Sequence, residues 1–299
     1  MSILVVGTVA LDTVQTPFGE ADNVLGGSAA YSALSASFFG KVKLVAVVGK
    51  DFPERFIGSL RAKGIDTEGL QIKKGKTFRW SGRYSYDLSN PETLKTELNL
   101  LSGFNPRIPD NYRDERFIFL ANIDPHVQLK VLEQLKAPEL VVSDTMNYWI
   151  EHQRKALRQV IKKTDILALN DAEARELSQE ANLIKAAKAL LGFGPRLVII
   201  KRGEYGCSLF SRTFSFYVPA YLLESTLDPT GAGDTFAGGF LGYLAACPRI
   251  NESSFKKAVA FGSIMASYTV EDFSLNRLFK LKKRDIEARF KDFQRLTRF

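Results

Sequence analysis

Short apolar runs alternate with segments of helical spacing along most of this chain, and this alternation constrains the fold more than any other feature. Because nearly every position in the runs is apolar, we expect strands covered on both faces. Strand–helix alternation predicts a mostly parallel sheet between layers of helices. The runs are Ile3–Val6, Leu44–Val48, Phe117–Leu120, Leu140–Val142, Ile166–Leu169 and Leu197–Ile200, and the helical segments between them are Pro53–Lys63, His126–Leu135, Trp149–Ile161 and Ala181–Leu191.

Polar residues and glycines gather directly after the apolar runs. The carboxyl ends of parallel strands meet at one edge of a sheet, so these clusters predict a long cleft along that edge. Asp144 and Asn147 belong to one cluster, and two interpretations stay open for them: contact with phosphate or substrate, or capping of the next helix. The clusters are Gly7–Asp12, Gly49–Asp51, Asn122–Asp124, Asp144–Asn147, Asn170–Asp171 and Lys201–Gly203.

Residues 77–86 break the pattern, because polar and aromatic residues alternate there with a period of two. We expect a strand outside the main sheet, since a sheet buried on both faces would not accept Arg79 and Arg83. Two readings of these arginines stay open, binding of a substrate phosphate or pairing with nearby carboxylates. The aromatic face, formed by Phe78, Trp80 and Tyr84, could stack on a base or form a dimer contact, and we favour packing.

The formal net charge of +8 is concentrated near the carboxyl end of the chain. Residues 280–299 carry eight basic and three acidic side chains. A nucleic-acid patch is one interpretation, because phenylalanines interleave with the charges. We favour a terminal helix whose buried stripe is Ile286, Phe290 and Phe293, and we therefore expect no nucleic-acid partner. The chain shows no signal-peptide pattern and no stretch long enough to span a membrane, so a cytoplasmic location is the simplest expectation.

The strongest chemical signal is the segment Asp228-Pro-Thr-Gly-Ala-Gly-Asp234, after which a helix is expected to run to about Ala246. Gly231, Ala232 and Gly233 can expose backbone N–H groups at the start of that helix, which suits a phosphate. A carboxylate beside an anion site makes sense when a hydroxyl must lose its proton as it attacks phosphorus. We therefore predict that Asp234 is a catalytic base; an N-terminal cap is the structural alternative.

Residues 228–241 resemble the C-terminal signature of the ribokinase/PfkB carbohydrate kinases, and shorter motifs extend the resemblance over nearly the whole chain. It implies a single ribokinase-like domain over residues 1–299, an α/β fold with a Rossmann-like, mostly parallel sheet and helices on both faces. A small β lid would come from about residues 12–24 and 72–102. The motifs are Val6-Gly7 with Asp12, Gly26-Gly27, Val48–Asp51, Gly64–Asp66, Asn170–Glu173 and Lys201–Gly206.

The resemblance also implies a role for individual residues in an ATP-dependent kinase. Asp12, Gly26 and Gly27 would hold the sugar, and Glu173 with Asn170 would order Mg²⁺. Lys201, Gly203, Gly206 and Thr230 would line the nucleotide side next to Gly231 and Gly233. Tyr31, Thr77 and Arg79 complete the expected substrate contacts. Whether a monovalent cation is also needed stays open, as does a homodimer paired through the lids.

The acceptor is a hydroxymethyl group, but its carrier stays open. Many sugar kinases of this family have asparagine where this chain has Tyr31. The loss of that carboxamide, with the aromatic strand, favours a nucleoside phosphorylated on its ribose 5'-hydroxyl. The prevalence of sugar kinases in the family favours a free sugar, and a sugar phosphate is third. A regulator that binds nucleotide without catalysis is the alternative from another class, and the intact Asp234 argues against it.

Overall fold

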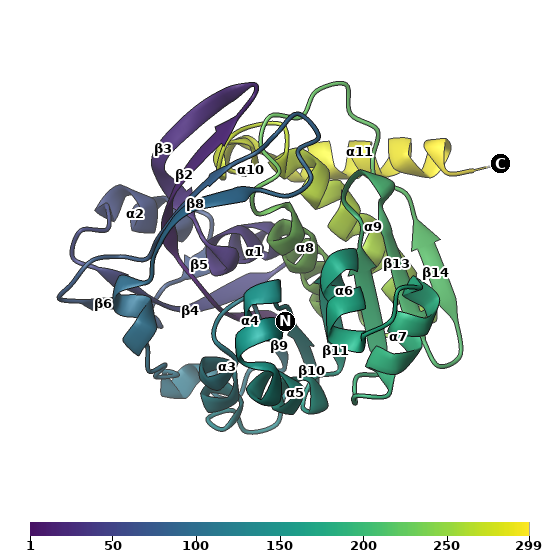
Figure 1. The fold of residues 1–299 in the computed structure, drawn as a ribbon, viewed down its shortest axis with the longest axis horizontal. Helices are drawn as coiled ribbons and strands as arrows, with labels where there is room; N and C mark the ends of the chain where they lie inside the picture. Colours follow the sequence, from purple (N-terminus) through teal and green to yellow (C-terminus); the bar gives the residue numbers. More distant parts are fainter. Residues whose placement is uncertain (299) are drawn as a thin grey trace.

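The computed structural model describes residues 1–298, and its largest element is a ten-stranded sheet (Figure 1). The six apolar runs form its parallel centre, in the order β4–β1–β9–β10–β11–β12. These strands are β1 (Ser2–Val6), β4 (Lys41–Gly49), β9 (Phe117–Leu120), β10 (Leu140–Ser143), β11 (Ile166–Asn170) and β12 (Leu197–Lys201). Two short strands, β5 (Ile65–Asp66) and β6 (Leu70–Lys73), pair with β4, and the antiparallel β13 (Cys207–Ser211) and β14 (Ser215–Val218) extend the other end.

Helices cover both faces of this sheet, as the continuous apolar runs predict. In β1, Ile3 and Val5 belong to one apolar core, whereas Leu4 and Val6 belong to the core on the opposite face. The first face is covered by α1 (Ser28–Ser37), α2 (Glu54–Ala62), α8 (Ala232–Ala246), α9 (Glu252–Thr269), α10 (Asn276–Lys280) and α11 (Lys283–Leu296); the second by α3 (Pro125–Leu132), α4 (Asn147–His152), α5 (Arg154–Lys162), α6 (Asp171–Ser178) and α7 (Leu183–Leu191). This α/β arrangement confirms the predicted fold class.

The helix expected over residues 149–161 is two helices in the structure. α4 ends at His152 and α5 begins at Arg154, with the break at Gln153 (φ −130°). The indole N–H of Trp149 donates a 2.9 Å hydrogen bond to the side-chain oxygen of Asn122, which follows β9. This contact with a distant segment directs α4 differently from α5, and sequence periodicity contains no trace of it.

A second, four-stranded sheet lies apart from the main one, in the order β3–β2–β7–β8 (Figure 1, purple and blue). Its strands are β2 (Ala10–Thr16), β3 (Gly19–Gly26), β7 (Arg79–Arg83) and β8 (Glu92–Glu97). β7 is shorter than the expected segment 77–86 but lies outside the main sheet, as its alternation predicts. Asp12 is in register with Trp80, and Leu11 with Arg79, so Asp12 and Trp80 share one face and Arg79 lies on the other.

The carboxyl-terminal stripe is buried against α9 and its surroundings. Ile286 and Phe293 are fully buried, and the ring of Phe290 stacks on Phe261 with centroids 4.4 Å apart. The packing interpretation of this basic segment is therefore confirmed. Within residues 1–298, no helix is both long enough and apolar enough to cross a membrane.

Helices α1 and α8 cross at Gly238, where the backbones approach so closely that no side chain fits. A Cβ atom on Gly238 would lie 2.2 Å from the backbone oxygen of Ser32. The predicted catalytic residues lie at the start of α8, and α1 begins directly after Gly27. The contact at Gly238 therefore fixes the position of those residues relative to α1.

We predict that Gly238→Ala destabilises the protein by about 1–3 kcal/mol, because the added methyl group must push two helices apart. The matched control is Gly58→Ala in α2, where the methyl group meets no atom within 4 Å. That change should stabilise by about 0.5–1 kcal/mol through helix propensity. Urea unfolding of both variants measures the difference. Equal effects of the two substitutions would contradict the close packing of α1 on α8.

Candidate active site

The glycine-rich segment Asp228–Asp234 forms the turn that begins α8. Gly231 has φ +74°, in the left-handed region that favours glycine. A Cβ atom on Gly231 would also lie 2.4 Å from the ring of Tyr31, so the contact excludes any side chain. At the start of α8, which begins at Ala232, the Ala232 N–H donates to the Pro229 carbonyl at 3.1 Å, and the N–H groups of Gly231 and Gly233 lie at the positive end of the helix. This turn therefore offers an anion site where the sequence predicts one.

Asp234 lies in the first turn of α8, as expected, next to that anion site. Burial raises the pKa of the Asp234 carboxyl to about 7; repulsion from Asp144 adds to the rise, and the ammonium of Lys201 opposes it. A general base works best when its pKa is near the working pH. Asp234 therefore combines the position and the proton affinity that a base needs.

Lys201 ends β12 and forms a buried ion pair with Asp144, which follows β10. Its Nζ atom lies 2.6 Å from Asp144 Oδ2, and would lie 3.1 Å from a Cβ atom on Gly233. Burial opposes the charge of Lys201, but Asp144 and Glu173 outweigh it and raise the pKa of the ammonium, which stays charged. Asp144 thus holds Lys201 against the anion site and does not cap α4, whose N-cap is Met146; Asn147 is the first residue of that helix.

Asn170 and Glu173 form a capping box at the start of α6. The Asn170 side chain accepts from the Glu173 N–H, and the Glu173 carboxylate accepts from the Asn170 N–H, both at 2.8 Å. Burial raises the pKa of Glu173 to about 8, and repulsion from Asp144 contributes. Asn170 and Glu173 therefore stabilise the start of α6, in addition to any ligand that they bind.

The charges around Lys201 fit a hard divalent cation bound together with phosphates. Besides burial, the charges of Asp144 and Asp234 raise the pKa of Glu173, and that of Asp144 raises the pKa of Asp234; the ammonium of Lys201 opposes both rises. Among residues 1–298, no cluster of three potential ligands could hold a metal ion by itself. Mg²⁺ commonly binds through one or two carboxylates, water and substrate phosphates, so this donor set suits it without an all-protein cage.

Asp12, Gly26 and Gly27 meet at the other end of the cleft. A Cβ atom on Gly26 would lie 1.8 Å from Asp12 Oδ2, so only glycine lets the carboxylate lie against this strand. Burial raises the pKa of Asp12 to about 7; the Gly27 N–H opposes the rise, and Asp228 and Asp234 add to it. Because the charge of Asp234 contributes to the raised pKa of Asp12, the two carboxylates lie near enough to influence one another's charge.

Gly203 and Gly206 form the turn that follows Lys201 and leads into β13. Within it, the Arg202 N–H donates to the Gly206 carbonyl at 2.8 Å. Thr230 lies on the adjoining loop: its N–H donates to Asp228 Oδ1 at 2.9 Å, and its hydroxyl to the hydroxyl of Tyr84 at 3.2 Å. The expected nucleotide-side residues thus lie on two segments: Gly203 and Gly206 follow Lys201 along the chain, and Thr230 directly precedes Gly231 at the start of α8.

Thr77 and Arg79 have a different position from the one expected of substrate contacts. Thr77 is fully buried: its hydroxyl donates to Asp51 at 2.7 Å and accepts from the Gly49 N–H at 3.0 Å. Arg79 pairs with Asp51 at 3.2 Å and with Asn23. Both residues tie the second sheet to the end of β4, so we leave them out of the proposed acceptor site.

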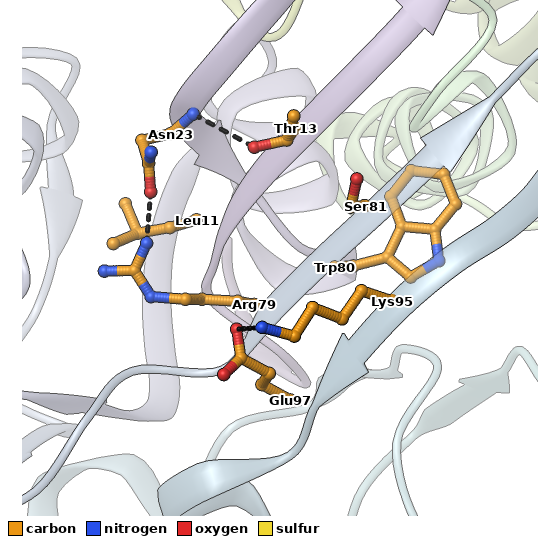
Figure 2. A pocket seen from close by; sticks show the side chains of 8 residues that line it. All are labelled: Leu11, Thr13, Asn23, Arg79, Trp80, Ser81, Lys95 and Glu97. Carbon is orange, nitrogen blue, oxygen red and sulfur yellow. Dashed lines mark hydrogen bonds and ion pairs between the residues drawn. The ribbon is translucent and has the colours of Figure 1, made fainter.

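Figure 2 shows a pocket of about 270 Å³ on the face of the second sheet that carries Arg79. Arg79 reaches toward Asn23 and Lys95 toward Glu97, the latter at 3.2 Å. Lys95 is thus paired within the pocket, whereas Arg79 pairs with Asp51 outside its lining. Trp80 also lines this pocket, although its place in the strand puts it on the face of Asp12. Arg83 likewise pairs with Glu92 at 3.9 Å, in agreement with the carboxylate-pairing interpretation of both arginines.

Asp228 received no role of its own from the sequence, and Tyr84 received only an open one as part of the aromatic face. Asp228 is 1% exposed and holds the turn through Thr230, although its place at the head of the glycine-rich motif was a signal. Tyr84 is buried beside Asp228 and Asp12, and its alternation with Arg83 indicated only its face. Tyr31, an expected substrate contact, is buried and packs its ring beneath Gly231, and its contact with substrate stays a prediction.

Comparisons with known proteins agree with this geometry. The family model "pfkB family carbohydrate kinase" matches residues 116–279. A cytidine kinase of Thermococcus kodakarensis is 35% identical over 254 residues, which cover 83% of this chain and 90% of the relative. A probable fructokinase-3 of Arabidopsis thaliana is 25% identical over 269 residues, covering 82% of this chain and 76% of the relative.

Solved structures share the fold over nearly the whole chain. The nucleoside kinase of Methanocaldococcus jannaschii, an archaeal member of the ribokinase family, has a TM-score of 0.76 at 21% identity, covering 97% of this chain and 98% of its own. A ribokinase II of E. coli in complex with ATP and Mg²⁺ has a TM-score of 0.77 at 18% identity, covering 97% and 99%.

The raised pKa of Asp12 predicts that this residue lowers stability at alkaline pH. Its folded-state pKa of about 7 exceeds the ordinary 3.8, so the folded protein loses stability as pH rises from about 4 through about 7. Asp12→Asn removes this titration, and should stabilise the protein by about 1–3 kcal/mol at pH 8 but little at pH 4.

Thermal unfolding at both pH values measures the effect. The control is Asp22→Asn on the neighbouring strand, where hydrogen bonds from Thr13 and Asn23 lower the carboxyl pKa. That variant should gain nothing at pH 8. An Asp12→Asn variant whose stability shows no pH-dependent gain would contradict the raised pKa of Asp12, and with it the burial of this carboxylate near Asp228 and Asp234.

Proposed function

The chain belongs to the pfkB family of carbohydrate kinases, and we propose that its acceptor is a nucleoside whose ribose 5'-hydroxyl receives the γ-phosphate of ATP. The kinase class, with an alcohol group of a sugar or nucleoside as acceptor, follows from the family and from the relatives of known activity. The observation that carries the catalytic assignment is Asp234 on the first turn of α8, where its charge acts on Asp12.

Asp12 and the backbone at Gly26 and Gly27 would hold the ribose hydroxyls and direct the hydroxymethyl group toward Asp234. As the oxygen of the acceptor hydroxyl attacks the γ-phosphorus, Asp234 accepts the proton of that hydroxyl. The bond between the γ-phosphorus and the β-phosphate oxygen breaks, and ADP leaves. The N–H groups at Gly231 and Gly233 would stabilise charge on the transferred group, whereas the Ala232 N–H, also expected there, donates to the Pro229 carbonyl. Positioning of the two reactants supplies much of the acceleration in such transfers.

The nucleotide would lie on the side of β12. Lys201, held by Asp144, supplies positive charge to the phosphates, and Gly203, Gly206 and Thr230 line the adjoining surface. Asn170 and Glu173 would order Mg²⁺ through water, and the ion would offset charge on the phosphates when bound. A requirement for a monovalent cation stays a prediction without a structural argument.

The second sheet supports a nucleoside over a free sugar. Trp80 is in register with Asp12 on the same face, and a Cβ atom on Gly82 would lie 2.3 Å from the indole, so glycine lets the ring lie flat against the strand. Trp80 and Phe78 are both only partly buried, which leaves an aromatic surface beside the ribose site for a base. The 35% identity to a cytidine kinase supports the same acceptor; the similarity to a fructokinase keeps a free hexose as the second candidate.

The same sheet supports the expected homodimer and the expected lid. Its edge strand β8 is exposed along most of its length, and Leu94 on that strand is 40% exposed. An unpaired edge of this kind can pair with another chain. The absence of a nucleic-acid partner and a cytoplasmic location also stay predictions.

We predict that Asp234→Asn lowers kcat by about 100- to 10,000-fold, because the amide cannot accept the acceptor's proton. ATP affinity should stay within a few-fold of wild type, since the anion site consists of backbone N–H groups. Coupled kinase assays and calorimetric titration with ATP measure the two quantities. Turnover within threefold of wild type would remove Asp234 from its assigned role.

We predict that a panel of nucleosides and sugars will give kcat/KM values at least about 10-fold higher for a nucleoside than for ribose or fructose, since stacking on aromatic rings adds about 1–3 kcal/mol per base. In a Trp149→Phe background, the fluorescence of Trp80 should change when the preferred nucleoside binds. Trp80→Ala should raise the KM for the nucleoside and leave that for a free sugar unchanged. Preference for a free hexose, with an unchanged Trp80 signal, would contradict the nucleoside proposal and favour a free hexose as the acceptor.

A further inference from the structure

Tyr84 joins the second sheet to the phosphate-binding turn. It follows β7 directly, and its N–H donates to the Gln15 carbonyl on β2 at 2.8 Å, which fixes its backbone to the sheet. Its side chain is 7% exposed, and its hydroxyl accepts the 3.2 Å hydrogen bond from Thr230. In the part of the chain that the structure describes, this is the one side-chain hydrogen bond between that sheet and the segment 228–234.

Ordinary packing does not account for Tyr84. Its ring belongs to none of the three apolar cores found among residues 1–298. It lies among polar groups instead: burial raises the pKa of its hydroxyl, the hydrogen bond from Thr230 opposes the rise, and Asp228 and Asp12 add to it. The hydroxyl therefore keeps its proton. Burying a hydroxyl is unfavourable unless hydrogen bonds compensate for it, so a purely structural site would favour phenylalanine.

The partner of Tyr84 is the residue that fixes the start of the anion site. Thr230 immediately precedes Gly231, and its own N–H is held by Asp228. Asp228 is anchored in turn by backbone contacts with Val270 and Ser274. Tyr84 is the hydrogen-bond partner of Thr230 that comes from the second sheet. A movement of that sheet would therefore alter the turn at Gly231 through the Thr230–Tyr84 hydrogen bond.

We propose that Tyr84 is a positioning residue for phosphoryl transfer, which holds Thr230 and the turn at Gly231 in place when the second sheet covers the acceptor. The proposal deepens the proposed function and rests on it. When the sheet covers the cavity, the bond is made and the anion site is ordered. When the sheet moves away, Thr230 loses this partner, so the transfer geometry forms together with the exclusion of water.

The kinetic test compares Tyr84→Phe with wild type at saturating ATP and acceptor. Removal of one hydrogen bond of this kind should lower kcat about 3- to 10-fold. Thr230→Val should have a similar effect, and Thr230→Ser, which keeps the hydroxyl, should restore most of the rate. The double variant Tyr84→Phe/Thr230→Val should be no slower than Thr230→Val alone, within about twofold, because both changes remove the same bond. Tyr86→Phe, on an 82% exposed ring two residues away, is the control and should leave kcat unchanged.

A second measurement does not depend on the acceptor. Amide hydrogen exchange at residues 230–234 should speed up at least about threefold in Tyr84→Phe and stay unchanged in Tyr86→Phe, with no ligand present. If no nucleoside is phosphorylated but exchange speeds up, the acceptor assignment fails and the role of Tyr84 in ordering the turn stands. Unchanged exchange, an unchanged kcat, or effects of Tyr84→Phe and Thr230→Val that multiply would each overturn the proposal.

Discussion

This candidate active site depends on the electrostatic repulsion among three carboxylates, which the positive charge of Lys201 opposes. Asp144, Glu173 and Asp234 converge on Lys201, and burial with mutual repulsion raises the pKa values of Glu173 and Asp234 to about 8 and about 7. Such a cluster opposes folding, and an extensive apolar sheet covered on both faces offsets it. The parallel order of the strands is what brings the cluster together, since β10, β11 and β12 all end at one edge.

Backbone geometry then decides where this charge can act. Gly231 places the start of α8 directly over Tyr31, Gly26 lets Asp12 lie against its strand, and Gly238 fixes α8 against α1. At each of these positions a methyl group would meet another atom closer than 2.5 Å. The anion site, the acceptor carboxylate and the base are therefore held at fixed separations by contacts that only glycine permits, which is the preorganisation that phosphoryl transfer needs.

Sequence periodicity was sufficient for the main sheet and for α8, because continuous apolar runs and a glycine-rich helix start are local signals. It was insufficient for Thr77 and Arg79, whose alternation gave the correct sheet but not their partner Asp51, which lies 26 and 28 residues away. The break between α4 and α5 depends on a Trp149–Asn122 contact of the same long-range kind. Side chains whose role is set by a distant residue leave no pattern in the chain around them.

The residues proposed for the chemistry and those proposed for the choice of acceptor lie in different sheets. Asp144, Lys201 and Asp234 belong to the main sheet and its helices, whereas Trp80 and Tyr84 come from the second sheet or the residue that follows it. Asp12 stands on the second sheet, and its pKa responds to the charge of Asp234 at the start of α8, so it links the two parts. Under the proposed assignment, changes on the aromatic face of the second sheet would alter the acceptor without disturbing the carboxylate cluster, because function depends on the site and not on the fold alone.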